Sequence, residues 1–217
     1  MDNYHNSSCE TIPEFGVVGD SFACGTYVDS GELISHYSDS WGAMIADRNG
    51  IDCFQFSVGG CTTRDWLDVA NEKGIKLLKE TKPLDLYIIA LGINDCYSLG
   101  KEYLGTANDI NFQNCDKNED SFYGNYAKII SEIRSYSASS EIILLTMYGN
   151  DWEDAVYFNE AIIEISELFE IPCIRLHEHS FFQSELCKNN MIDFHPTLLG
   201  YSEMSKVIEE LLKKEVE

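Results

Sequence analysis

A hydroxyl, a side-chain amide and an imidazole stand at three distant points of the 217-residue chain, each in a turn-forming sequence. Ser21 follows a Gly-Asp pair, Asn94 follows a Gly-Ile pair, and His195 precedes a proline. A serine hydroxyl attacks ester carbonyls when an imidazole accepts its proton, and N–H donors stabilise the oxyanion that results. Each fragment alone is typical of an ordinary turn or helix cap. Their combination predicts an acyl-transfer site, provided that the fold brings the three side chains to one edge.

Apolar runs that alternate with helix-like segments supply the elements for such an edge. Residues 84–91 form a nearly continuous apolar run, which is typical of a strand buried on both faces of a parallel sheet. The other expected strands are 15–18, 53–58, 141–147 and 171–176, and the expected helices are 41–48, 63–79, 123–136, 154–169 and 199–214. This alternation predicts an α/β fold, a three-layer α/β/α sandwich around a five-stranded, mainly parallel sheet. Ligands of such sheets bind beyond the carboxyl ends of the strands, where Ser21 and Asn94 would lie.

The length of the chain favours one domain, because domains usually span roughly 100–200 residues. We expect residues 1–12 to form a loose N-terminal tail and residues 13–217 to form a single domain. Residues 96–120 are rich in Asn, Asp, Gly and Tyr and interrupt the alternation. They are expected to form an inserted loop that shapes specificity together with residues 148–153.

Acidic residues dominate the charge of the chain. It holds 15 Lys and Arg against 37 Asp and Glu, which gives a formal net charge of −22. Nucleic acids and anionic membranes require a concentrated basic face, and the scattered basic residues do not supply one. No run approaches the roughly 18 apolar residues of a membrane span. We therefore expect a small-molecule partner, no nucleic acid and no membrane span, and we leave the oligomeric state open.

The cysteines and histidines outside the candidate site carry weaker expectations. The eight cysteines contain no C-x-x-C pair and are expected to be reduced, mostly buried thiols, which favours a cytoplasmic location. The polar start of the chain lacks the pattern of a secretory signal. Whether a signal peptide was removed earlier stays open. Cys24 and Cys61 are expected to be packing residues. His177 and His179 lack a third ligand at a recognisable spacing, so no metal is expected. The chemistry requires no organic cofactor.

Four short blocks stand, in order, at the predicted strand ends and before the last helix. They are Gly19-Asp20-Ser21-Phe22, Gly60-Cys61-Thr62, Gly92-Ile93-Asn94-Asp95, and His195-Pro196-Thr197 with Gly200-Tyr201. Together they resemble the motif blocks of the SGNH hydrolases, the GDSL-type esterases and lipases, with Phe22 in place of the name-giving leucine. The resemblance extends over residues 15–212, which is nearly the whole chain.

The resemblance implies a serine esterase, a carboxylic ester hydrolase that works through an acyl-enzyme. Ser21 would be the nucleophile, and His195 would take its proton and return it to the leaving alcohol. The N–H groups of Ser21 and Gly60 and the side-chain amide of Asn94 would form the oxyanion hole.

The carboxylates of the blocks carry different expectations. Asp20 and Asp95 would be structural residues near the site. The family places its third catalytic residue, an aspartate, three positions before the histidine, but this chain has Ile192 there and Asp193 one position later. Three arrangements follow: a bulged loop that brings Asp193 to His195, a main-chain carbonyl such as that of Ile192 in its place, or a weakened or inactive site.

The expected substrate is a small or medium acyl ester, such as an acetylated sugar, a short-chain ester or a lysolipid. Two other functions fit the same blocks. One is a non-catalytic descendant that binds a sugar or acyl ligand, and the other is an acyltransferase that uses the same site. Acyl length, the alcohol part of the substrate and the choice between hydrolysis and transfer stay open at this stage.

Overall fold

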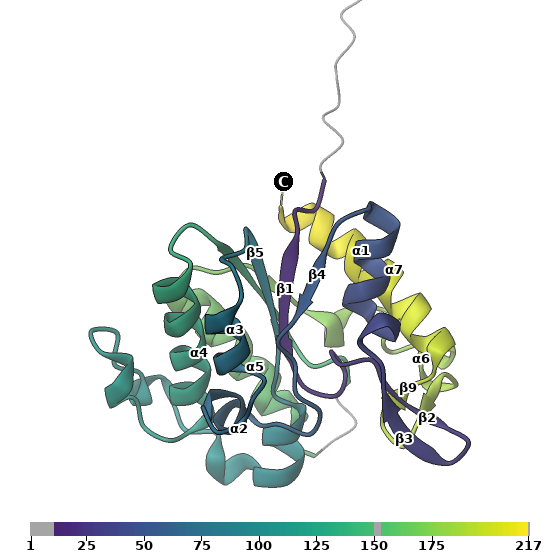
Figure 1. Cartoon of the computed structure of the whole chain (residues 1–217). Coiled ribbons are helices and arrows are strands. Elements are labelled where there is room, and N and C mark those ends of the chain that lie inside the picture. Colours follow the sequence, from purple (N-terminus) through teal and green to yellow (C-terminus); the bar gives the residue numbers. More distant parts are fainter. Residues whose placement is uncertain (1–10, 150–152, 217) are drawn as a thin grey trace, which may run out of the picture.

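Five parallel strands form the centre of the molecule in the computed structural model, which describes residues 11–149 and 153–216 (Figure 1). The strands are β1 (Phe15–Gly19), β4 (Cys53–Gln55), β5 (Leu86–Ala90), β6 (Glu141–Leu145) and β7 (Cys173–Ile174). They lie in the order β4-β1-β5-β6-β7, and all neighbours are parallel. Every residue of β1 and β5 is buried, as their apolar sequences require for strands that are covered on both faces.

Helices cover both faces of this sheet (Figure 1). One face carries α2 (Thr63–Leu67), α3 (Ile75–Glu80), α4 (Phe122–Tyr136) and α5 (Ala155–Phe169), and the other carries α1 (Trp41–Asn49), α6 (Glu185–Lys188) and α7 (Leu198–Glu215). Each face has its own apolar core, with Phe122 and Phe158 in the first and Trp41 and Tyr201 in the second. The expected three-layer α/β/α sandwich with a five-stranded parallel sheet is therefore confirmed.

One expected helix is in fact two. The segment 63–79 forms α2 and α3 with turns between them, because Gly74 adopts a left-handed conformation (φ 64°) at the start of α3. A side chain at Gly74 would place its Cβ 2.6 Å from the carbonyl oxygen of Trp66. Trp66 is fully buried and donates its indole N–H to the carbonyl of Phe56 at 2.7 Å. The glycine therefore lets the chain turn closely around a core tryptophan.

Two short hairpins were not expected from the sequence. The first, β2 (Thr26–Asp29) with β3 (Glu32–Ser35), directly follows the turn that carries Ser21. Its connection, Ser30-Gly31, has positive φ at both residues, which is the turn geometry that two-residue hairpins favour. The second hairpin pairs β8 (Met191–Ile192) with β9 (His195–Pro196) just before α7. Both lie at the edge of the molecule next to the carboxyl end of β1 (Figure 1).

The segment between β5 and α4, expected as an inserted loop at 96–120, is a series of single helical turns. A π-helical turn, η2 (Asp95–Leu99), is followed by the 3-10 turns η3 (Lys101–Tyr103), η4 (Ala107–Asp109) and η5 (Cys115–Lys117). Polar contacts hold this segment in place, including an ion pair of 2.8 Å between Arg64 and Asp120.

Parts of the expected tail and of the 148–153 loop lie outside the described residues. Of the tail, residues 1–10 are not described, whereas Ile12 is buried in the core beneath α1 and α7. Of the loop, residues 150–152 are not described. No helix in the described ranges is both long and apolar enough to span a membrane.

Candidate active site

Ser21 lies in a tight turn at the carboxyl end of β1. The carboxylate of Asp20 accepts the N–H of Phe22 at 3.0 Å, and the main-chain carbonyl of Asp20 accepts the N–H groups of Ala23 and Cys24 at 3.1 and 3.0 Å. Gly19 is required here, because a Cβ at this position would lie 2.5 Å from the Cβ of Ala23. The turn therefore folds back on the strand and leaves Ser21 as its half-exposed residue.

The imidazole of His195 meets this serine from the other end of the chain. Its Nε2 lies 3.1 Å from Ser21 Oγ, a contact between residues 174 positions apart. Its Nδ1 lies 2.8 Å from the main-chain carbonyl oxygen of Asp193. A carbonyl accepts only, so Nδ1 carries the proton and Nε2 is left as the base that faces the serine.

The partner of Nδ1 is a main-chain carbonyl, as in the second arrangement that the sequence left open, but it belongs to a different residue. It is neither the carboxylate of Asp193 nor the carbonyl of Ile192, but the carbonyl of Asp193. The reason is the two-residue hairpin loop, in which Asp193 (φ 47°) and Phe194 (φ 64°) both take the left-handed conformation. That turn directs the Asp193 carbonyl back toward His195. Tyr148 helps to hold it by donating its hydroxyl to the Phe194 carbonyl at 2.6 Å.

The expected oxyanion donors lie along the same cleft. Asn94 Nδ2 donates one hydrogen to the carbonyl of Cys61 at 3.0 Å, and its amide group carries a second hydrogen. Asp95 accepts the backbone N–H of Thr63 at 3.0 Å and its hydroxyl at 2.6 Å. These bonds tie the end of β5 to the start of α2 and so set Asn94 beside Gly60.

Tyr201, in the first turns of α7, connects the nucleophile turn to the hairpin β2–β3. Its buried hydroxyl lies 2.9 Å from the carbonyl of Thr26 and 3.3 Å from the carbonyl of Ser21. Its ring packs near Phe22, with centroids 6.3 Å apart. The sequence placed Tyr201 in the last block without a role, and the structure shows that it contacts the carbonyls of Ser21 and Thr26.

A cleft of about 420 Å³ joins these groups. Ser21, His195, Gly60 and Asn94 line it together with an apolar set made of Phe22, Ile93, Tyr97, Tyr148 and Phe194. Sequence reasoning missed three further lining residues, Thr26, Leu33 and Ser35, because it missed the hairpin that carries them. The Ser30-Gly31 dipeptide between two short runs with apolar residues, a typical hairpin turn, was the signal that could have found it.

Known proteins share the sequence pattern and the fold of this chain. The sequence pattern of the GDSL-like lipase/acylhydrolase family matches residues 17–202. The chain belongs to this family. This chain is 25% identical to the uncharacterized protein YpmR of Bacillus subtilis, over 97% of the chain and 86% of that protein.

Solved structures share its fold at low identity. The lipase/acylhydrolase of Enterococcus faecalis has a TM-score of 0.63 at 20% identity, covering 93% of this chain and 96% of that one. A carbohydrate esterase whose active site displays divergent catalytic and non-catalytic binding functions has a TM-score of 0.59 at 15% identity, covering 93% of this chain and 68% of that one.

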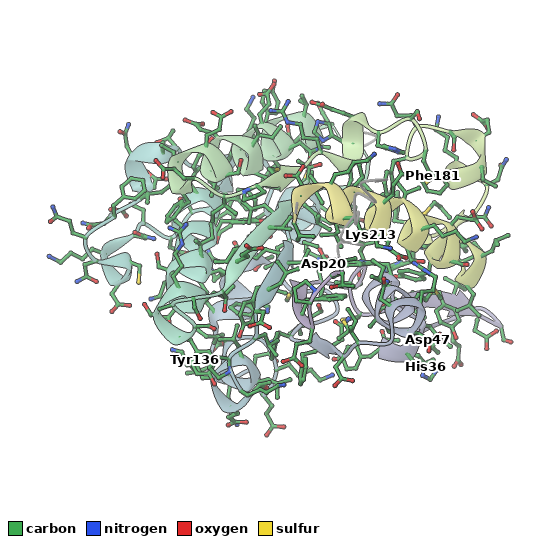
Figure 2. The ribbon with its side chains drawn as sticks, turned by 90° about the horizontal axis from the view of Figure 1, so that it is seen from above. Asp20, His36, Asp47, Tyr136, Phe181 and Lys213 are labelled. Carbon is green, nitrogen blue, oxygen red and sulfur yellow. The ribbon has the colours of Figure 1, made fainter. Side chains whose placement is uncertain are left out.

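Two buried carboxyl groups lie behind the cleft. Asp20 and Asp95 are completely inaccessible to solvent, and Figure 2 shows Asp20 near the centre of the molecule. Burial raises the pKa of Asp20 to about 7 and that of Asp95 to about 6, against hydrogen bonds that lower both. Asp20 Oδ2 has no hydrogen-bond donor in the described part of the chain. Both carboxyls therefore destabilise the folded state when they ionise.

The cysteines near Ser21 are not suited to be nucleophiles. Burial raises the pKa of the Cys24 thiol to about 12 and raises the pKa of the Cys61 thiol further. A thiol attacks as its thiolate, so both groups are unreactive near neutral pH.

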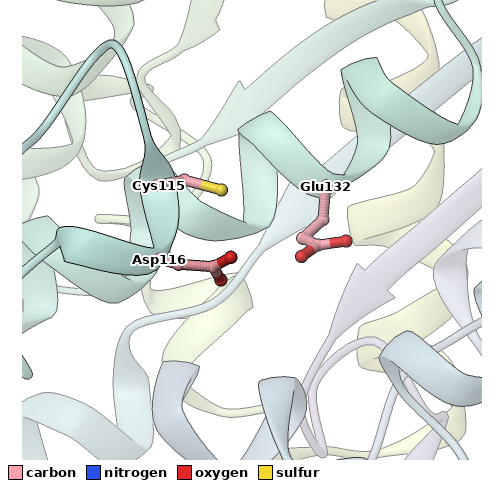
Figure 3. Close-up of side chains that lie close together, drawn as sticks. All are labelled: Cys115, Asp116 and Glu132. Carbon is pink, nitrogen blue, oxygen red and sulfur yellow. The ribbon is translucent and has the colours of Figure 1, made fainter.

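One cluster far from the cleft has the donor types of a metal site. Cys115, Asp116 and Glu132 offer ligand atoms within 4.8 Å of one another (Figure 3). However, Lys128 lies 2.8 Å from Asp116 and Lys79 lies 2.8 Å from Glu132. Each carboxylate already has a cationic partner, and we assign no metal to the cluster.

The histidines that the sequence paired, His177 and His179, are a separate case. The ring Nδ1 of His177 lies 2.8 Å from the hydroxyl of Thr146.

The raised pKa of Asp20 predicts a pH-dependent stability. Between its unfolded pKa of 3.8 and its folded pKa of about 7, the folded chain holds this proton more tightly, so the free energy of unfolding falls as pH rises. Replacing Asp20→Asn removes the ionisation. The difference in unfolding free energy between pH 5 and pH 8 should then shrink by roughly 2–3 kcal/mol in urea titrations.

Asp47→Asn is the matched control, because Asp47 is exposed on α1 at the periphery of the molecule (Figure 2). It should leave the pH 5 to pH 8 difference at its wild-type value. An Asp20→Asn chain whose difference also equals that of the wild type would contradict the assignment of a proton to Asp20.

Proposed function

We propose that this protein is a serine esterase that hydrolyses small or medium uncharged acyl esters through an acyl-enzyme on Ser21. The observation that carries the proposal is the 3.1 Å contact between Ser21 Oγ and His195 Nε2 in the cleft. A hydroxyl in contact with an unprotonated imidazole nitrogen is the arrangement that activates a serine. Gly60 and Asn94, which line the same cleft, supply donors for the oxyanion.

The reaction proceeds in two balanced halves. Ser21 Oγ forms a bond to the ester carbonyl carbon while His195 Nε2 takes its proton, and the oxyanion rests on the N–H groups of Ser21 and Gly60 and on the Asn94 amide. The bond to the alcohol oxygen then breaks, and His195 returns the proton to that oxygen. Water repeats the sequence on the acyl-enzyme, with His195 as its base, and releases the acid and free Ser21.

His195 works in this proposal with a backbone partner. The Asp193 carbonyl, 2.8 Å from Nδ1, fixes the tautomer and the orientation of the ring. As a neutral dipole it stabilises the imidazolium less than a carboxylate does. The site is therefore a Ser-His dyad with a main-chain support.

The cleft favours an uncharged ester. Its described lining residues include one carboxylate, that of Asp193, and neither lysine nor arginine. The net charge of −22 further disfavours anionic substrates. Acetylated sugars and short-chain esters fit these conditions better than lysolipids that carry a phosphate.

Replacing Ser21→Ala tests the nucleophile. The initial rate of p-nitrophenyl acetate hydrolysis should fall by about 10³-fold or more, because no acyl-enzyme can form. Cys24→Ala, three residues along the same turn, is the control and should keep the rate within about threefold of the wild type. Equal rates for wild type and Ser21→Ala would instead favour a non-catalytic binding protein. Transfer of the acetyl group to an added alcohol in preference to water would favour an acyltransferase.

Replacing Asp193→Asn tests the support of the imidazole. The carbonyl of residue 193 is kept and only the carboxylate is lost, so kcat/KM for p-nitrophenyl acetate should stay within about threefold of the wild type. His195→Ala should lose about 10³-fold or more in the same assay. A loss of that size in Asp193→Asn would show that the carboxylate, and not the carbonyl, acts on His195.

Replacing Ile192→Asp tests the position of the missing carboxylate. Ile192 is the residue directly opposite His195 in the β8–β9 pair, and opposite side chains of an antiparallel pair lie on the same face, about 5 Å apart at Cβ. A carboxylate there should reach Nδ1 and stabilise the imidazolium. We expect kcat/KM to rise by roughly tenfold, whereas Ile192→Asn, of the same shape, should give no rise. An unchanged or lower rate in Ile192→Asp would contradict this geometry.

A further inference from the structure

The cleft beside Ser21 and His195 has two chemically different walls. The first, the aromatic wall, consists of Ile93, Tyr97, Tyr148 and Phe194. The second, the ribbon wall, consists of Thr26, Leu33 and Ser35 from the hairpin β2–β3. An ester also has two parts, an acyl group and an alcohol. Each wall can therefore be matched to one part of the substrate.

The register of the hairpin turns one of its faces toward the cleft. Thr26 pairs with Ser35 and Val28 pairs with Leu33, so these four side chains lie on the same face of the ribbon. The hydroxyls of Thr26 and Ser35 are 2.7 Å apart, which agrees with this register. Tyr27 and Ile34 lie on the opposite face, where the Tyr27 hydroxyl donates to Asp39 at 3.1 Å. Three of the four residues on the first face line the cleft.

The direction of proton transfer decides which wall faces the alcohol. His195 Nε2 delivers its proton to the leaving oxygen, so the alcohol must lie beside the strand that carries His195. β2 packs against that strand, β9, and the Tyr201 hydroxyl binds the carbonyls of both Thr26 and Ser21. The ribbon wall is therefore fixed next to the proton donor and the nucleophile.

Ile93 and Tyr97 place the aromatic wall next to the expected oxyanion donor. Ile93 and Tyr97 flank Asn94, the expected oxyanion donor, and the ring of Tyr97 packs on Phe194 with centroids 6.2 Å apart. This leaves the aromatic wall to the acyl group, whose carbonyl oxygen points at Asn94.

The chemistry of the ribbon wall then limits the alcohol. Two hydroxyls that share one hydrogen bond keep one O–H donor and several lone pairs for a ligand. Leu33 adds apolar surface, with 58% of it exposed, and the described lining holds neither lysine nor arginine. We infer that the ribbon wall is the leaving-group subsite and that it selects uncharged alcohols bearing further hydroxyl groups, as in sugars and glycerol. This inference rests on the proposed esterase function.

Matched pairs of acetates test the subsite, because each pair shares its acyl group. Methyl 6-O-acetyl-glucoside is compared with cyclohexylmethyl acetate, and glycerol 1-monoacetate is compared with propyl acetate, by the kcat/KM of acetic acid release. The wild type should prefer the hydroxylated member of at least one pair. The pair that shows the larger preference identifies the sugar or the glycerol as the source of the alcohol.

Variants of the ribbon wall assign the preference to its residues. Ser35→Ala should lower kcat/KM for the hydroxylated ester by about 3–10-fold, the value of one hydrogen bond, and leave the apolar ester unchanged. Ser35→Thr keeps the hydroxyl and should retain the wild-type preference for the hydroxylated ester. Leu33→Ala should lower kcat/KM for both members alike. Ile34→Ala, on the opposite face of the same strand, is the control for damage to the hairpin and should change neither.

The outcomes separate the subsite from the proposed function. A Ser35→Ala chain with an unchanged ratio between the members of a pair overturns the subsite, as does a wild type that prefers the apolar members. A wild type that hydrolyses none of the four acetates nor p-nitrophenyl acetate overturns the esterase function itself.

Discussion

The hydrogen bond between Ser21 Oγ and His195 Nε2 joins segments 174 positions apart, and much of the surrounding structure serves to hold its two ends. The serine end is rigid because β1 lies inside the sheet, between β4 and β5, and because Asp20 folds the next residues back on the strand. The histidine end stands on a hairpin of two residues per strand. Tyr201 links the two, since it lies in the first turns of α7, just after that hairpin, and reaches the carbonyl of Ser21. The single hydrogen bond between Ser21 and His195 thus depends on the register of the central sheet and on the packing of α7.

The anchors of this contact lower the stability of the fold at neutral pH. Asp95 accepts three hydrogen bonds from Thr63 and so fixes the loop that carries Asn94, but its burial still raises its pKa to about 6. Within the described residues, only one carboxylate oxygen of Asp20 accepts a hydrogen bond, and burial raises the pKa of Asp20 to about 7, above that of Asp95. Apolar residues would cost less energy in these places but would not hold the two turns. Active sites commonly violate the rules of a stable core in this way, and the cost is met elsewhere in the fold.

Local sequence was sufficient for the features that depend on neighbours in the chain. The apolar runs of β1 and β5 predicted buried parallel strands, and the glycine-rich blocks after them predicted where Ser21 and Asn94 would lie. The features that were missed depend on register and on contacts between distant segments. Thr26, Leu33 and Ser35 reach the cleft only because a four-residue ribbon pairs in one register, and strands this short give a weak periodic signal. Gly74 is a poor helix former and marks a weak point in the segment 63–79, but its close approach to Trp66 is a packing contact that the local sequence does not reveal.

The support of His195 shows how a shift of one residue changes the chemistry of a site. In a hairpin with a two-residue loop, the residue three positions before the histidine is its partner across the ribbon, and the residue two positions before it lies in the turn. A carboxylate at the first position shares a face with the imidazole, whereas at Asp193 the turn presents the main chain instead. The imidazole of His195 is then oriented by backbone geometry, which does not depend on the side chain of residue 193 but does depend on the left-handed conformation of Asp193 and Phe194. That conformation costs about 1–2 kcal/mol per residue for L-amino acids. The same turn sets the ring of Phe194 against Tyr97, so one strained loop both orients the base and builds a wall of the cleft.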